Sequence, residues 1–214
     1  MALAKEGLTF RSDGIENGTS DVYDDQAWTT SFKLSKEFIE AHPISPSGKA
    51  LKEVVKLQRN EWIEIVNKDS YALGMHIPSG EPLTASSCEE SVKLAFEFFD
   101  NIVPDKKIDV IICSSWLFDD QIPSILPSTS KLSSFNEEFY LLPIKGSDAQ
   151  TFERVFNQKE KDLSNLPSET SMQRAFLKFI QEGGHFRLGS CFLHRDCTGW
   201  GKGSDKFQFN FKSK

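Results

Sequence analysis

Histidine is the side chain best suited to move protons near neutral pH, and this chain of 214 residues has four. One of them, His76, stands near the end of an apolar stretch at residues 71–77, two residues before Pro78. A neutral imidazole there could accept the proton of an attacking amine. The alternative is a structural histidine whose hydrogen bonds fix the Pro78 turn, because no orienting partner is evident in the sequence.

Two serines and a tryptophan, Ser114, Ser115 and Trp116, end the next apolar stretch. Ligands collect at the carboxyl ends of strands in open α/β sheets, so either hydroxyl is a candidate for protonating or hydrogen-bonding a leaving group. Trp116 could contact a ligand, although a core position is the alternative. The preceding Cys113 follows an apolar run with nothing nearby to lower its pKa, so we expect an inert thiol.

Cys191, His194 and Cys197 have the residue types of a metal site. In a strand over residues 186–194, however, Cys191 and His194 point to opposite faces, and the group lacks a second pair of ligands. We therefore predict no metal. A disulfide framework belongs to smaller and denser chains, so we also expect four free thiols.

These candidates depend on elements that the apolar periodicity and the turn residues predict. Residues 8–10 could form a short strand, and residues 28–34 and 38–42 are expected to form a hairpin. For residues 52–62 the pattern does not decide between a strand and a helix. Strands are expected at residues 71–77, 109–117, 138–144 and 186–194. Helices are expected at residues 86–101, 119–127, 151–156 and 170–181. Ser86 with Glu89, and Thr170 with Gln173, are predicted capping boxes. Residues 109–117 read as a strand buried on both faces, with Ile111 and Ile112 beneath opposite layers.

This order, hairpin strands followed by β-α-β-α-β, predicts an α/β (α+β) fold with a mixed, mostly antiparallel sheet flanked by helices. We expect Phe96, Phe99, Phe176 and Phe179 to pack against that sheet. One domain would span residues 1–195. Residues 196–214 would form a Gly-rich tail whose end alternates apolar and polar residues and could pair as an edge strand.

Composition narrows the function classes. The net charge is −6 with both signs interspersed, which disfavours a nucleic-acid partner. No apolar run approaches the roughly 18 residues of a membrane span, and the first residues lack a secretory signal. We expect a cytoplasmic protein with no membrane partner.

Several segments together resemble a bacterial acyltransferase family with a GNAT-like (N-acetyltransferase-like) C-terminal domain. They are FRSDG at 10–14, MHIPSGEPL at 75–83, CSSWL at 113–117, ILP at 125–127, FYLLP at 139–143 and LPSETSMQR at 166–174. They occur in the family's order over residues 8–195. Two departures stand out: the family often has histidine where this chain has Ser114, and its members usually carry a further helical N-terminal domain.

The resemblance implies transfer of an acyl group from acyl-CoA to a small-molecule or peptide amine by direct attack. His76, Ser114 and Ser115 would then be catalytic. Gly74, Ile77, Ser79, Gly80, Thr84 and Trp116 would surround the cofactor, with its pyrophosphate at the start of the helix after residue 84. A separate helical domain of the N-terminal type is an expected partner.

The alternative is a GNAT-fold interaction module that has lost CoA binding. The acidic residues Glu81, Glu89 and Glu90 near that helix start favour it, because they compete with a diphosphate for the helix dipole. The lack of a tyrosine between Trp116 and Phe139, where GNAT enzymes often use one, also favours the interaction module.

Overall fold

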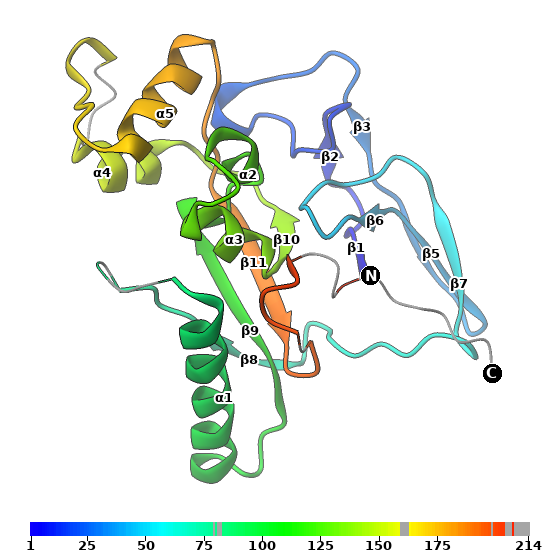
Figure 1. Ribbon diagram of the computed structural model, residues 1–214. Coiled ribbons are helices and arrows are strands. Elements are labelled where there is room, and N and C mark those ends of the chain that lie inside the picture. Colours follow the sequence, from blue (N-terminus) through cyan, green and yellow to red (C-terminus); the bar gives the residue numbers. More distant parts are fainter. Residues whose placement is uncertain (79, 81–82, 159–162, 198, 204–206, 208–214) are drawn as a thin grey trace.

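A computed structural model describes residues 1–78, 80, 83–158, 163–197, 199–203 and 207 of the chain (Figure 1). Ser79, one of the residues expected near the cofactor, lies outside this part, as does most of the alternating tail. Within the described residues, no helix is long and apolar enough to cross a membrane.

The central element is a four-stranded sheet in the order β10-β11-β9-β8. Its strands are β8 (Tyr71–Gly74), β9 (Ile108–Ser115), β10 (Tyr140–Pro143) and β11 (Gly189–His194). β8 and β9 run parallel, whereas β9, β11 and β10 are antiparallel to their neighbours. A helix connects the parallel pair, as a crossover between parallel strands requires.

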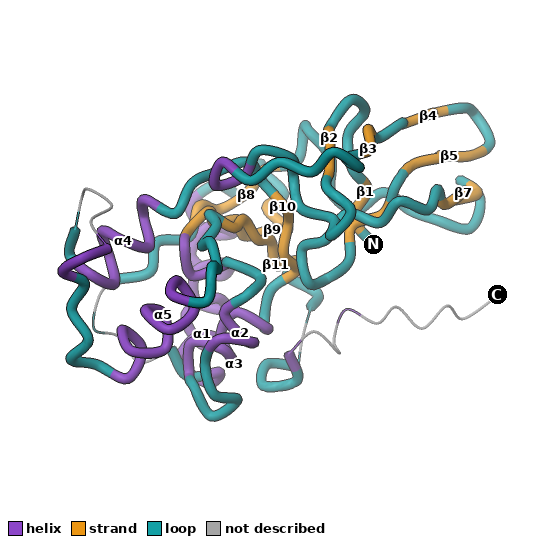
Figure 2. Tube along the Cα trace, turned by 90° about the horizontal axis from the view of Figure 1, so that it is seen from above, coloured by secondary structure: helices purple, strands orange, loops and turns teal. Residues whose placement is uncertain are grey.

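The N-terminal quarter of the chain forms shorter strands that lie together beside this sheet (Figures 1 and 2). A hairpin of β4 (Phe32–Leu34) and β5 (Phe38–Ala41) is extended by β7 (Val55–Gln58), and two further pairs are antiparallel. The first pair is β1 (Ala2–Leu3) with β6 (Pro43–Ile44), and the second is β2 (Thr9–Phe10) with β3 (Trp28–Thr29).

The described residues form five α-helices around the sheet: α1 (Ala85–Ile102), α2 (Ile122–Ile125), α3 (Lys131–Glu137), α4 (Ala149–Phe156) and α5 (Ser171–Gln181). Figure 2 shows α1, α2 and α3 on one side of the sheet. Three 3-10 turns complete the described elements: η1 (Thr19–Asp21), η2 (Trp116–Phe118) and η3 (Leu163–Asn165).

Three apolar clusters hold these elements together. Leu73 and Ile111 of the sheet pack with Phe96 of α1, while a second cluster joins α2, α4 and α5 around Phe176. The third joins β10 and β11 to the N-terminal strands. Phe96 and Phe176 are buried, as expected, whereas Phe99 and Phe179 are half-buried.

The prediction for Ile112 is wrong, because its side chain is 46% exposed. Alternation along β9 directs Ile111 to α1 and Ile112 to the opposite face. On that face Ala72, Gly74 and Ser114 are also exposed. Within the described part of the chain, the sheet is therefore covered on the α1 side and open on the other side at its β8–β9 end.

The expected strand at residues 28–34 is two strands in different sheets. Between them, Thr30 is buried, and its hydroxyl donates to the carbonyl of Lys5. Its backbone N–H donates to Leu8. These bonds tie Thr30 to the loop before β2, so the ladder of β3 cannot continue into β4. The undecided stretch 52–62 contains β7.

Candidate functional site

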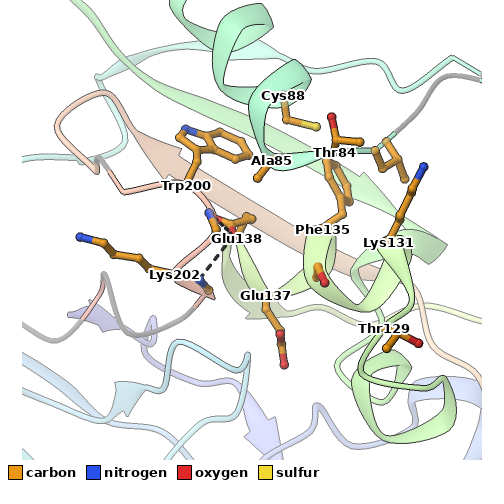
Figure 3. Close-up of a pocket in the computed structure, with 14 residues that line it drawn as sticks. Thr84, Ala85, Cys88, Thr129, Lys131, Phe135, Glu137, Glu138, Trp200 and Lys202 are labelled. Carbon is orange, nitrogen blue, oxygen red and sulfur yellow. Dashed lines mark hydrogen bonds between the residues drawn. The ribbon is translucent and has the colours of Figure 1, made fainter.

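A cavity of about 600 Å³ opens at the start of α1 (Figure 3). Three distant parts of the chain line it: the first turn of α1, the α3 region and the segment after β11. Its lining residues are Leu83, Thr84, Ala85, Cys88, Thr129, Lys131, Ser134, Phe135, Glu137, Glu138, Trp200, Gly201, Lys202 and Gly203. Thr84 is the one predicted site residue among these lining residues.

Thr84 is the N-cap of α1, and its hydroxyl accepts a hydrogen bond from the backbone N–H of Ser87 at 3.3 Å. The predicted cap at Ser86 is therefore wrong, since the helix begins one residue before it. The first N–H groups of a helix have no partner within it and carry a partial positive charge. Those of α1 lie at the edge of the cavity, where an anion could bind them.

Two lysines line this cavity, Lys131 at the start of α3 and Lys202 after β11. Glu137 and Glu138 line it as well, but Glu138 is buried, and its carboxylate accepts hydrogen bonds from the backbone N–H groups of Gly201 at 2.8 Å and Gly203 at 3.4 Å. These bonds fold the segment after β11 onto the site. Trp200 is held by an edge-to-face contact with Phe139, their ring centres 5.9 Å apart.

Cys88 presents its thiol in the same cavity (Figure 3). Burial raises its pKa, and the charge of Glu138 raises it further. The thiolate is the nucleophilic form. A raised pKa disfavours that form, so the thiol serves as part of the apolar lining of the cavity.

The parallel strands β8 and β9 part beside this helix start. They are in register up to Gly74 and Ile112, and the last bond between them runs from the N–H of Met75 to the carbonyl of Ile112, at 2.9 Å. β9 continues to Ser115, paired there with β11 alone. Among the residues that the structure describes, the edge of β9 that β8 leaves thus has no strand partner over its last three residues.

Gly74 and His76 lie where the strands part. An ideal Cβ at Gly74 would meet no atom within 4 Å, so the space above this residue is open. β8 ends before His76, which is exposed and makes no hydrogen bond within the described residues. Both interpretations of His76, as a base and as a support of the Pro78 turn, stay predictions.

The two serines have different roles. The hydroxyl of Ser115 accepts from the N–H of Leu117 at 3.3 Å and so caps η2. The hydroxyl of Ser114 lies 3.1 Å from that of Ser190 on β11 and is exposed on the open face of the sheet. Ser114 is the better placed of the two for chemistry on that face.

The remaining predicted cofactor-binding residues differ in their surroundings. Gly80 has a left-handed backbone with φ of 87°, which glycine adopts without strain. Ile77 packs on the core cluster beside β10 and β11, and Trp116 packs edge-to-face on Phe176. Both side chains are partly buried by these contacts and partly exposed, so their contacts with the cofactor stay predictions.

In the described part of the chain, no three His, Cys, Asp or Glu side chains gather as metal ligands do. Cys191 is buried, and Nδ1 of His194 accepts a hydrogen bond from the N–H of Asp196 at 3.2 Å.

Sequence comparison assigns the family. Residues 32–193 match the family model of the GNAT-like C-terminal domain. The chain belongs to the GNAT-like C-terminal domain family. This confirms the expected family. No curated protein matches the chain significantly.

Solved structures share the GNAT-like fold. One is an acyltransferase in complex with decanoyl-CoA, with 21% identity, a TM-score of 0.52 and coverage of 76% of this chain and 45% of that one. Another is an acyltransferase in complex with decanoyl-CoA and teicoplanin, with 21% identity, a TM-score of 0.51 and coverage of 76% and 46%. The match thus spans less than half of each neighbour's length. The expected fold class is confirmed.

Proposed function

We propose that this chain is an acyltransferase domain that transfers an acyl group from acyl-CoA to an amine. One observation carries the proposal: β8 and β9 part beside a cavity that contains the start of α1. Such an arrangement would provide a passage from the helix side of the sheet to its open face.

The pyrophosphate of acyl-CoA would bind at the start of α1. The free N–H groups of the first turn donate to phosphate oxygens, and Lys131 and Lys202 add two positive charges from other segments. Thr84 positions this turn through its bond to Ser87. Trp200 offers an aromatic surface in the same cavity.

The pantetheine arm would pass between the parted strands. Its amides can pair with the backbone of β9 beyond Ile112, which β8 has left. The thioester would then lie on the open face near Gly74, where no side chain blocks the approach. Ile112, exposed on the same face, offers an apolar contact to the acyl chain.

The reaction would be a direct displacement. The acceptor nitrogen attacks the thioester carbonyl, a tetrahedral intermediate forms, and the C–S bond breaks to release CoA thiolate. His76 would accept the proton that the nitrogen loses. The hydroxyl of Ser114, which donates to Ser190 in the structure, would turn to hydrogen-bond the departing thiolate, and solvent would protonate that thiolate. Holding both substrates in the passage supplies much of the rate gain.

Calorimetry with CoA and with acyl-CoAs of increasing chain length, from acetyl to decanoyl, tests binding. Release of free thiol from acyl-CoA in the presence of a panel of amines tests transfer. Binding at a hundred times Kd should also stabilise the fold by about 2.7 kcal/mol. If none of the acyl-CoAs binds, the enzyme proposal fails and the interaction module stands.

A further inference from the structure

One row of residues crosses the central sheet on its open face. Gly74 of β8 pairs with Ile112 of β9, and Ile112 pairs on its other side with Phe192 of β11. Phe192 in turn pairs with Tyr140 of β10. Paired residues of neighbouring strands point to the same face, so these positions form a line across the strands. The line begins at Gly74, where the proposed function places the thioester.

Exposure to solvent falls along this row. Gly74 is exposed, Ile112 is 46% exposed and Phe192 is half-buried. Tyr140 is 2% exposed, and its ring stacks on that of Phe192 with the centres 4.8 Å apart. Its hydroxyl donates to the carbonyl of Ile44 in β6, which holds the ring in place. The accessible part of the row therefore runs from Gly74 to Phe192 and ends against a fixed aromatic ring.

The apolar part of the row is narrow. Ser114 and Ser190 form the next pair along β9 and β11 on the same face, with their hydroxyl oxygens 3.1 Å apart, and so border it with polar groups. The exposed parts of Ile112 and Phe192 are far smaller than the roughly 800 Å² per partner that a stable protein interface buries. A strip one side chain wide instead matches the width of a single hydrocarbon chain.

The length of the strip determines which chains can cover it. Neighbouring strands lie about 4.8 Å apart, so Phe192 lies about 10 Å from Gly74 across the sheet. With C–C bonds of about 1.5 Å in an extended zigzag, about eight carbons cover that distance. A shorter chain leaves Phe192 in water, and a longer one reaches the fixed ring of Tyr140.

We propose that Ile112 and Phe192 bind the hydrocarbon chain of the acyl group and select medium-chain acyl-CoAs of about eight carbons. This inference rests on the proposed function and adds the class of acyl donor to it. The chain starts at the thioester near Gly74, lies across β9 and β11, and removes their exposed apolar side chains from water.

Calorimetry with acetyl-, butyryl-, hexanoyl-, octanoyl- and decanoyl-CoA tests this selection. Complete burial of one methylene raises affinity about fourfold, so contact on one side should raise it about twofold. We expect octanoyl-CoA to bind about 60-fold more tightly than acetyl-CoA. Decanoyl-CoA should gain no more than about twofold beyond octanoyl-CoA, because the strip ends at Tyr140.

Two variants test the position of the chain. Ile112→Ser and Phe192→Ser should each weaken octanoyl-CoA binding by about tenfold and change acetyl-CoA binding by less than about threefold. Leu34→Ser is the matched control, because Leu34 is 61% exposed on β4, outside the strip, and should leave both affinities unchanged. Urea unfolding checks the fold of each variant, and the exposed position of Ile112 keeps the test valid if Phe192→Ser is unstable.

The outcomes separate this inference from the proposed function. Acetyl-CoA bound as tightly as octanoyl-CoA would overturn the inference and leave the proposed function standing. A preference for octanoyl-CoA that survives unchanged in Ile112→Ser would also overturn it, because the chain would then lie elsewhere. Failure of every acyl-CoA to bind, acetyl-CoA included, would overturn the proposed function and this inference with it.

Discussion

Replacing Gly74 by valine is expected to weaken acyl-CoA binding without lowering the stability of the fold. Gly74 pairs with Ile112 at the point where β8 and β9 part, and an added Cβ would meet nothing within 4 Å. A β-branched residue in a strand is more favourable than glycine by about 0.5–1 kcal/mol. Gly74→Val should therefore leave the free energy of unfolding unchanged or raise it slightly. The same methyl groups would occupy the space proposed for the thioester.

We expect the affinity for acyl-CoA to fall at least tenfold, a loss of about 1.4 kcal/mol, measured by calorimetry. Ala72→Val is the matched control, since Ala72 is exposed on the same face of β8, two residues before the strands part. Urea unfolding provides the stability of both variants. Full acyl-CoA affinity in Gly74→Val would refute the proposed path of pantetheine, whatever its stability.

Three further predictions concern other parts of the molecule. His76→Ala should lower kcat by roughly 10²-fold with acyl-CoA affinity retained, and an unchanged kcat in a steady-state assay would remove its role as base. Phe176→Ala should lower the free energy of unfolding, measured in urea, by roughly 3–5 kcal/mol. The reason is that the ring of Phe176 is 0% exposed and packs on Phe186, with the ring centres 4.5 Å apart. A loss under about 1 kcal/mol would contradict this packing. Burial raises the pKa of Asp119 from 3.8 to about 6, so the native state binds its proton more tightly than the unfolded chain. Its contribution to stability is then greatest below pH 3.8 and falls by about 3 kcal/mol as the pH rises to 7. Asp119→Asn should remove this part of the pH dependence of the urea midpoint, and an unaltered slope would argue against the raised pKa.

Local signals predicted the helices well. The capping box of Thr170 and Gln173 is present in full, with both reciprocal bonds at the start of α5. At α1, two hydroxyl residues two positions apart could each have been the cap, and the local pattern selected Ser86. The cap is Thr84. A cap at Thr84 makes both Ala85 and Ser86 helical, two residues more than a cap at Ser86 would allow, and spacing alone does not reveal this advantage.

Long-range pairing was harder to predict. The apolar run of β9 suggested burial on both faces, yet nothing among the described residues covers Ile112. Periodicity reports which residues are apolar, whereas the covering layer depends on where distant segments go. The split at Thr30 has the same origin, because its partners Lys5 and Leu8 lie more than twenty residues away.

The same limit applied to the charge of the site. Along the sequence, acidic residues surround the start of α1, and a diphosphate there looks unfavourable. In space, Glu89 and Glu90 are exposed to water, which screens them, and neither lines the cavity. Glu137 and Glu138 do line it, and the carboxylate of Glu138 already accepts hydrogen bonds from two backbone N–H groups. The positive charges come from Lys131 and Lys202, more than forty residues along the chain. The acidic residues beside the helix start are therefore weak evidence against an anion at this site, whereas Glu137 and Glu138 offset the charge of the two lysines that line the cavity.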